Sequence, residues 1–116
     1  MSIFNLKKPK ALGTGQMIQN GGISDKEVLS KLLGYRKSVV AGYRSLLVDD
    51  ISSNIAFGEM YVSPKIDGEL WFLIIDNGEA VLSNTSGKVI FGDIPLLDEV
   101  KAQMNRFQGQ SIFAGE

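Results

Sequence analysis

The sequence predicts an α+β fold: N-terminal helices, then an antiparallel β meander, a helix and a short strand. Three observations support this prediction. Apolar residues recur at helical spacing in the first half of the chain, short apolar runs separated by turn signals follow after residue 58, and a helical pattern returns over 96–107. With 116 residues, the chain can form one domain around a single core.

Residues 1–22 are predicted to be irregular, because Pro9 and four glycines interrupt any periodicity. A helix is expected to begin at 24–27, where Ser24 and Glu27 fit a capping box. In that motif the serine hydroxyl accepts a hydrogen bond from a free backbone N–H. The apolar positions that follow are Val28, Leu29, Leu32 and Leu33. Gly34 is expected to end this helix.

A second helix is predicted over about 36–50. Its apolar side consists of Val39, Val40, Tyr43, Leu46 and Leu47. Two arginines and two tyrosines of this region could face a phosphate backbone. They are Tyr35, Arg36, Tyr43 and Arg44. The alternative is an exposed helix face with packed rings.

The second half of the chain has the pattern of a β meander. Met60 and Val62 begin a strand that Pro64 must interrupt or end, because proline cannot donate to a strand ladder. The run at 70–75 is apolar at every position, as in a central strand that is buried on both faces. The segment 76–79 contains Asn-Gly and predicts a two-residue hairpin. Strands over 80–82 and 88–91 follow, joined by a turn at 83–87.

The last part of the chain predicts a helix and a short strand. Asp93-Ile94-Pro95 is typical of a helix start. The apolar face of this helix comprises Leu96, Leu97, Val100, Met104 and Phe107. Gly109 is expected to close the helix, and 111–114 forms the final strand. An apolar strand this close to the last residue indicates a cut domain, because complete domains usually cover or pair such an edge.

The composition excludes several chemistries. Cysteine and histidine are absent, which excludes disulfides, the usual zinc sites, cysteine nucleophiles and Ser-His-Asp arrangements. A divalent metal held by carboxylates and phosphates stays compatible with the sequence. The net charge is −1, so the chain has no overall basic character. Residues 1–24 and 31–44 nevertheless carry basic side chains without acidic ones, which suits either a phosphate-facing surface or a solvated one.

The sequence also bears on location. No apolar run approaches the ~18 residues that span a bilayer, so no membrane partner is expected. The first residues lack the apolar segment of a secretory signal, which predicts a cytoplasmic protein.

The segment Lys65-Ile66-Asp67-Gly68 is the main candidate for chemistry. Partial burial or a nearby cation lowers the pKa of a lysine and makes its amine a nucleophile. An aspartate two positions along a strand shares its face and can orient the ammonium, or contact a ribose or a metal. A glycine lets a ligand approach the backbone closely. The alternative is a surface lysine–aspartate pair beside a turn glycine.

The segment SPKIDGEL resembles the K-x-D-G motif of the covalent nucleotidyltransferases, a superfamily of DNA ligases, RNA ligases and capping enzymes. Two further segments, SNTSGK at 83–88 and SIFAGE at 111–116, resemble later motifs of this superfamily and occur in the same order. The resemblance covers about 57–116, and the ATP-dependent DNA ligases are the most similar group. Two positions depart from that pattern, because the ligases commonly have glutamate at the position of Ser63 and arginine at that of Leu70.

The resemblance implies roles for individual residues. Lys65 would attack the α-phosphate of ATP and form a lysyl-AMP intermediate, and the AMP would pass to a 5′-phosphate before strand joining. The residues implied to line the nucleotide site are Ser63, Asp67, Gly68, Ser83, Asn84 and Glu116. Glu116 would also assist a magnesium ion, since phosphoryl transfer builds negative charge that a divalent cation neutralises.

The resemblance further implies an organisation and a partner. Residues 1–56 would be an N-terminal arm and helical segment, and residues 57–116 the first, incomplete part of an adenylation domain. The implied partner is nicked DNA, or RNA, bound through a longer protein. The residues alone are expected to be inactive, because the family's later motifs are not among them. Two alternatives stay open: an RNA ligase or mRNA-capping type of enzyme, and a non-catalytic binding or scaffold domain in which Lys65 and Asp67 form only an ion pair.

Overall fold

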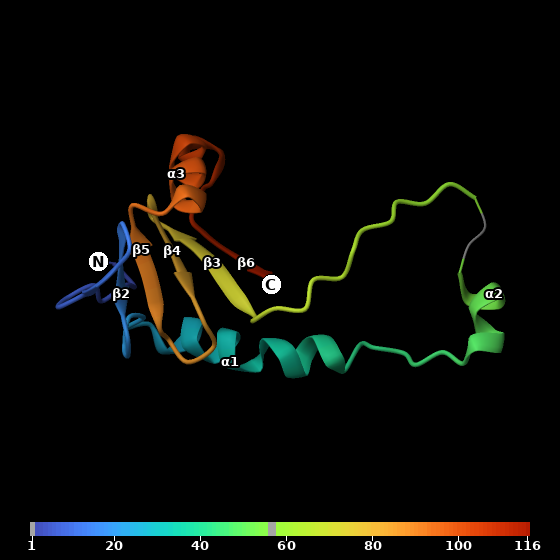
Figure 1. The fold of residues 1–116 in the computed structure, drawn as a ribbon. Coiled ribbons are helices and arrows are strands. Elements are labelled where there is room, and N and C mark those ends of the chain that lie inside the picture. The colour runs from blue at the N-terminus through green and yellow to red at the C-terminus, as the bar shows by residue number, and fades with distance from the viewer. Residues whose placement is uncertain (1, 56–57) are drawn as a thin grey trace.

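The computed structural model describes residues 2–55 and 58–116. Within these ranges, six strands form one antiparallel sheet in the order β1-β2-β5-β4-β3-β6, with helix α1 on one face and α3 on the other (Figure 1). The strands are β1 (Lys10–Leu12), β2 (Gly15–Ile18), β3 (Trp71–Asp76), β4 (Glu79–Ser83), β5 (Val89–Gly92) and β6 (Gln110–Gly115). The helices are α1 (Lys26–Val40), α2 (Ile51–Asn54) and α3 (Pro95–Ala102). The predicted α+β class is confirmed. None of the described helices is long and apolar enough to cross a membrane.

The prediction that residues 1–22 are irregular is wrong. They contain the β1–β2 hairpin, and β2 adds to the sheet by pairing with β5, with Ile18 opposite Val89. The glycine at position 22 allows the backbone to approach β5 closely. A Cβ at Gly22 would lie 2.5 Å from Cγ2 of Val89, and the Gly22 N–H donates to the Gly87 carbonyl at 3.1 Å. The glycines that obscure any period in the sequence therefore let this segment lie against the sheet.

Helix α1 differs from its prediction at both ends. Its N-cap is Asp25, whose Oδ1 accepts hydrogen bonds from the backbone N–H groups of Glu27 (2.8 Å) and Val28 (3.2 Å). Ser24, predicted to be the cap, instead donates its hydroxyl to the Ile3 carbonyl at 2.9 Å. The helix also does not end at Gly34 but continues to Val40. One glycine inside a helix costs only about 1 kcal/mol, which tertiary contacts can offset.

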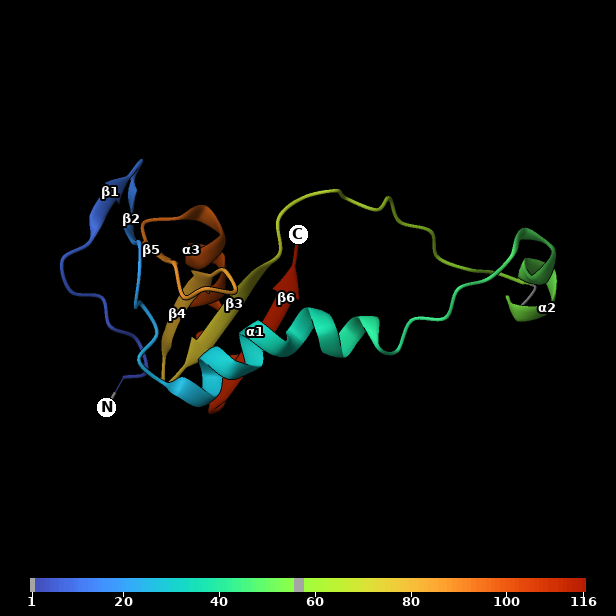
Figure 2. The ribbon, with the colours of Figure 1, turned by 90° about the horizontal axis from the view of Figure 1, so that it is seen from below.

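The predicted helix over 36–50 and the predicted strand at 60–62 are both wrong. Between α1 and residue 55, the chain forms one 3₁₀ turn at Val48–Asp50 and the four-residue α2, and the described residues 58–70 have no helix or strand. Residues 41–55 and 58–70 project from the sheet, and we call them the arm (Figures 1 and 2). Most of its apolar side chains are exposed: Val48 is 83% exposed and Tyr61 fully exposed, whereas Leu70, next to β3, packs against the core. Most helical stability in proteins comes from such packing, so the periodic pattern alone does not produce a helix here.

The predicted meander forms from β3, β4 and β5. Asn77 (φ 50°) and Gly78 (φ 81°) make the two-residue turn between β3 and β4, which confirms the hairpin. Strand β3 is buried on both faces as predicted, because Phe72 and Ile74 lie toward α1 while Ile75 lies toward α3. β6 pairs with β3 along its whole length. The helix predicted over 96–107 is shorter: α3 ends at Ala102, and a 3₁₀ turn follows at Met104–Arg106.

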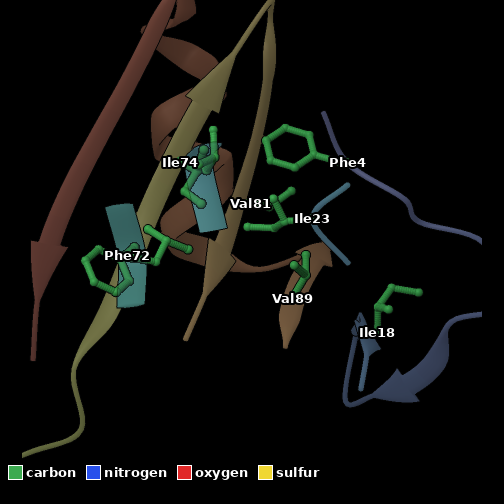
Figure 3. Close-up of a cluster of buried hydrophobic side chains, with 9 residues drawn as sticks. Phe4, Ile18, Ile23, Phe72, Ile74, Val81 and Val89 are labelled. Carbon is green, nitrogen blue, oxygen red and sulfur yellow. The ribbon is translucent and has the colours of Figure 1, made fainter. Parts of the chain in front are cut away.

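The larger core cluster lies between the sheet and α1 (Figure 3). Its buried members are Phe4, Ile18, Ile23, Val28, Leu32, Phe72, Ile74, Val81 and Val89. A smaller cluster under α3 contains Ile75, Ala80 and Leu97. Residues from both sides of the division predicted at 56/57 share the larger cluster, so residues 2–40 and 71–116 form one body. The two residues at the division itself lie outside the described residues.

Candidate functional site

The candidate site lies where the arm returns to the sheet, beside the end of β6. Helix α1 extends past the sheet at this point, so its last turns lie near β6 rather than beneath the core (Figure 2). The Tyr35 ring packs edge-on against Phe72, with centroids 5.4 Å apart, which ties this part of α1 to β3. Helix α1, the arm and the strands β3 and β6 thus converge at one end of the sheet, with β6 at its edge.

Lys65 and Glu116 line the same cavity, which has a volume of about 440 Å³. The sequence separates these residues widely, and the fold brings them together because β6 runs alongside β3 and the arm leads into β3. The other lining residues come from both ends of the arm, the end of β6 and the overhang of α1. They are Tyr35, Arg36, Val39, Val40, Tyr43, Leu70, Ala114 and Gly115. The Lys65 side chain is exposed to solvent in this open cavity.

A hydrogen bond joins the arm to Glu116 beside this cavity. The Gly68 N–H donates to Oε2 of Glu116 at 3.2 Å, a contact between residues 48 positions apart. Gly68 does not have the left-handed backbone that would require glycine, and a Cβ there would meet Glu116 at an ordinary 3.6 Å. The absence of a side chain at this position is therefore not explained by packing within the chain.

Lys65 and Asp67 do not form the ion pair of the structural alternative. Across residues 2–55 and 58–116, the one ion pair within 4.0 Å joins Lys31 to Glu27. Asp67 and Ser63 are exposed on the arm and do not belong to the lining of this cavity. The predicted shared face of Lys65 and Asp67 depended on a strand that the arm does not form.

The turn after β4 is built by Asn84. Its Oδ1 accepts hydrogen bonds from the backbone N–H groups of Ser86 and Lys88, both at 3.0 Å, and from the Ser86 hydroxyl at 2.9 Å. Ser83 is fully buried and donates its hydroxyl to the Asn84 carbonyl at 2.9 Å. Ser83 thus supports the turn from inside, and it offers no exposed group to a ligand.

A second cavity of about 530 Å³ adjoins the first and includes this turn. Its lining residues are Leu33, Arg36, Gly68, Glu69, Leu70, Asn84 and Thr85. Arg36 and Leu70 line both cavities. The predicted residues are therefore divided: Lys65 and Glu116 are in the first cavity, Gly68 and Asn84 in the second.

The first cavity contains one side-chain carboxylate that could bind magnesium, that of Glu116. Among the described residues, no three acidic side chains lie close enough together to hold a metal ion. Glu116 has one carboxylate oxygen bonded to Gly68, and its carboxylate is the acidic group lining the first cavity. Magnesium commonly binds through one or two carboxylates together with substrate phosphates, so a single carboxylate is compatible with an ion that arrives with a nucleotide.

Arg36 was predicted to lie in the second helix, over about 36–50, and was therefore not expected beside Lys65 and Glu116. Arg36 follows the buried Leu32 by one helical turn, and that spacing is visible in the sequence once the helix is continued through Gly34.

Comparison of the chain with protein-family models, with curated proteins and with solved structures gives no match.

Proposed function

We propose that the protein is an ATP-dependent DNA ligase-like nucleotidyltransferase, with Lys65 as the nucleophile. The observation that carries the proposal is the shared cavity of Lys65 and Glu116, together with the hydrogen bond from Gly68 that ties the K-x-D-G segment to Glu116. The K-x-D-G resemblance alone leaves these residues apart in the sequence. The fold brings Lys65 and Glu116 to one cavity. This proximity supports a covalent nucleotide site, because the nucleophile and the ligand-orienting groups must lie within reach of one phosphate.

The proposed chemistry is a phosphoryl-type transfer to nitrogen. The Lys65 ammonium gives a proton to solvent, and its amine attacks the α-phosphorus of ATP and forms a P–N bond. The bond from that phosphorus to the oxygen bridging to the β-phosphate breaks, and pyrophosphate leaves with the electron pair. The nitrogen then loses a proton to solvent, and AMP stays on Lys65 until an oxygen of a nucleic-acid 5′-phosphate attacks the same phosphorus. The P–N bond then breaks, the lysine amine leaves and takes up a proton, and AMP passes to the 5′-phosphate.

The other residues predicted to line the nucleotide site differ in how close they lie to the two cavities. Gly68 and Glu116 are joined directly and could contact the ribose, with Glu116 also available to a magnesium ion that arrives with ATP. The carboxylate would bind that ion, whose chemistry is to neutralise charge on phosphoryl oxygens. Asn84 faces the adjoining cavity, whereas Ser83 acts behind it. Ser63 and Asp67 would join the site only through movement of the arm.

The test begins with nucleotide binding by residues 1–116, measured by isothermal titration calorimetry with ATP and magnesium. We expect Lys65→Ala and Glu116→Gln each to weaken ATP binding about tenfold, since each removes one charge-assisted contact. Lys101→Ala is the matched control, because Lys101 is an exposed lysine in the last turn of α3, on the opposite face of the sheet. Equal binding by the wild type and Lys65→Ala, or no ATP binding at all, would reject the proposal in favour of a non-catalytic domain.

Intact-mass spectrometry then tests the covalent step. We expect ATP binding without an AMP adduct, because residues 1–116 do not include the motifs that this superfamily places after its Gly-Glu segment. An adduct that maps to Lys65 would confirm the nucleophile and disprove the expectation that these residues are insufficient. An adduct on any other lysine would contradict the assignment of Lys65.

A further inference from the structure

Arg36 occupies the boundary between the two cavities. It lines the first together with Lys65 and Glu116, and it lines the second together with Gly68 and Asn84. Leu70 is also common to both linings but is apolar. Arg36 is therefore the one charged side chain that lines both of these described cavities.

The fold explains why Arg36 lies there. Leu32, one helical turn earlier, is 1% exposed and packs in the core under the sheet. Residues four apart share a helix face, so Arg36 continues that face beyond the end of the sheet, where no strand covers it. The neighbouring Tyr35 fixes this turn through its edge-on contact with Phe72. The backbone at Arg36 is thus anchored while its guanidinium is left exposed.

Within residues 2–55 and 58–116, no carboxylate lies within 4.0 Å of the Arg36 guanidinium. Of the acidic and basic groups in the described residues, only Lys31 and Glu27 come within 4.0 Å of one another. The segment 31–44 carries three further basic residues and no acidic one. A guanidinium presents five donors in a planar fork that matches phosphate oxygens, and it binds them in pairs.

We propose that Arg36 binds the β- and γ-phosphates of a nucleoside triphosphate and thereby selects triphosphates over monophosphates. The inference rests on the proposed function for its nucleotide, because Lys65 in the adjoining cavity is the group that would attack the α-phosphorus. With the α-phosphate beside Lys65, the leaving pyrophosphate needs a cationic neighbour, and Arg36 lines the same cavity. Arg36 is a specificity-determining residue in this scheme, and it takes no part in bond making.

The inference is tested with tripolyphosphate, which has the phosphate chain but neither base nor ribose. Calorimetry gives the affinity, and the Nε–H resonance of Arg36 reports contact in a ¹⁵N-labelled sample. We expect Arg36→Ala to weaken tripolyphosphate binding about tenfold or more and to leave AMP binding within about twofold. Arg36→Lys keeps the charge without the fork and should give an intermediate loss.

Lys37→Ala is the matched control, because Lys37 is the next residue of α1, exposed and outside both cavities. It should change tripolyphosphate binding by less than about twofold. Equal losses for Arg36→Ala and Lys37→Ala would show general charge attraction and overturn the inference. The inference also fails if wild-type protein does not bind tripolyphosphate, or if Arg36→Ala reduces binding of a 5′-phosphorylated oligonucleotide only.

The two proposals can fail separately. ATP binding that depends on Lys65 but not on Arg36 would support the proposed function and overturn the phosphate anchor. Tripolyphosphate binding that depends on Arg36, together with ATP binding that is indifferent to Lys65, would support the anchor and reject the lysine nucleophile. Circular dichroism of each variant shows whether the fold is retained, which the exposure of Arg36 leads us to expect.

Discussion

Replacing Gly34 by alanine tests the continuity of α1 directly. Gly34 lies inside the helix, does not have a positive φ, and has open space where a Cβ would be added. No new contact and no clash are therefore expected, and the substitution changes only the backbone's helical preference. The structure predicts that Gly34→Ala stabilises the protein.

The magnitude follows from the helix propensities. Alanine is favoured over glycine in an exposed helix interior by about 0.8–1 kcal/mol. The entropy of unfolding is about 2.1 cal/mol/K per residue, so for 116 residues 1 kcal/mol corresponds to about 4 °C in melting temperature. We expect Gly34→Ala to raise the free energy of unfolding by slightly less than 1 kcal/mol and the Tm by about 3–4 °C.

Urea denaturation followed by circular dichroism measures the free energy, and a thermal scan measures the Tm. Gly78→Ala is the control of opposite sign, because Gly78 has a φ of 81° in the β3–β4 turn and alanine is strained there. A loss of stability on Gly34→Ala would refute the reasoning. It would mean that Gly34 ends the helix in a left-handed conformation, as the sequence pattern first suggested, and would remove Arg36 from the face that Leu32 defines.

Three further substitutions test other parts of the fold by the same denaturation assay. Gly22→Ala should destabilise the protein by about 1–3 kcal/mol, because its Cβ would lie 2.5 Å from the buried side chain of Val89; wild-type stability would contradict that close approach. Asp25→Ala should cost about 1 kcal/mol through loss of the N-cap, while Asp25→Asn, which keeps an acceptor, should cost much less; equal losses would argue against the cap. Tyr35→Leu should cost about 0.5–1.5 kcal/mol through the ring pair with Phe72, whereas Tyr43→Leu, at a position 73% exposed, should be nearly neutral; equal effects would reject the ring pair as a tie.

The parts of the fold that were predictable are those determined by neighbouring residues. The Asn77-Gly78 turn is selected by its own two φ angles, and β3 is recognisable because it carries most of the apolar run at 70–75, which has to be buried on two faces. Strand β2 was missed for the opposite reason. Its partner β5 lies far along the chain, and four residues of GQMI have no alternating pattern that would reveal it.

The predicted helix boundaries were wrong where tertiary contacts determine how far a helix extends. Gly34 is a common stop signal, but the contact of Tyr35 with Phe72 lies beyond it, and the helix continues. Residues 41–47 have a helical apolar pattern, yet Leu47 is 75% exposed and nothing in the described structure covers it. A pattern predicts which residues could face a core, and it does not show whether a core is within reach.

The candidate site was predictable in its members more than in its arrangement. Motif order indicated that Lys65 and Glu116 belong together, and they line one cavity. Arg36 was predicted to lie in a second helix, apart from these residues, and Ser83 was implied to line the nucleotide site although it is fully buried behind the turn. Only the three-dimensional path of α1 past the end of β6 shows that a cation lies at the junction of the two cavities.

The arm has a consequence for the integrity of the chain. The core clusters draw their buried side chains from residues 4–32 and 72–97, and none from the arm. A protease that cuts at Lys65 or Arg44, both on the exposed arm, would thus sever the polypeptide without removing a single side chain from either cluster. The two pieces would stay associated through β2, α1 and the sheet, much as complementing fragments do, while Lys65 lost its covalent tether to one side.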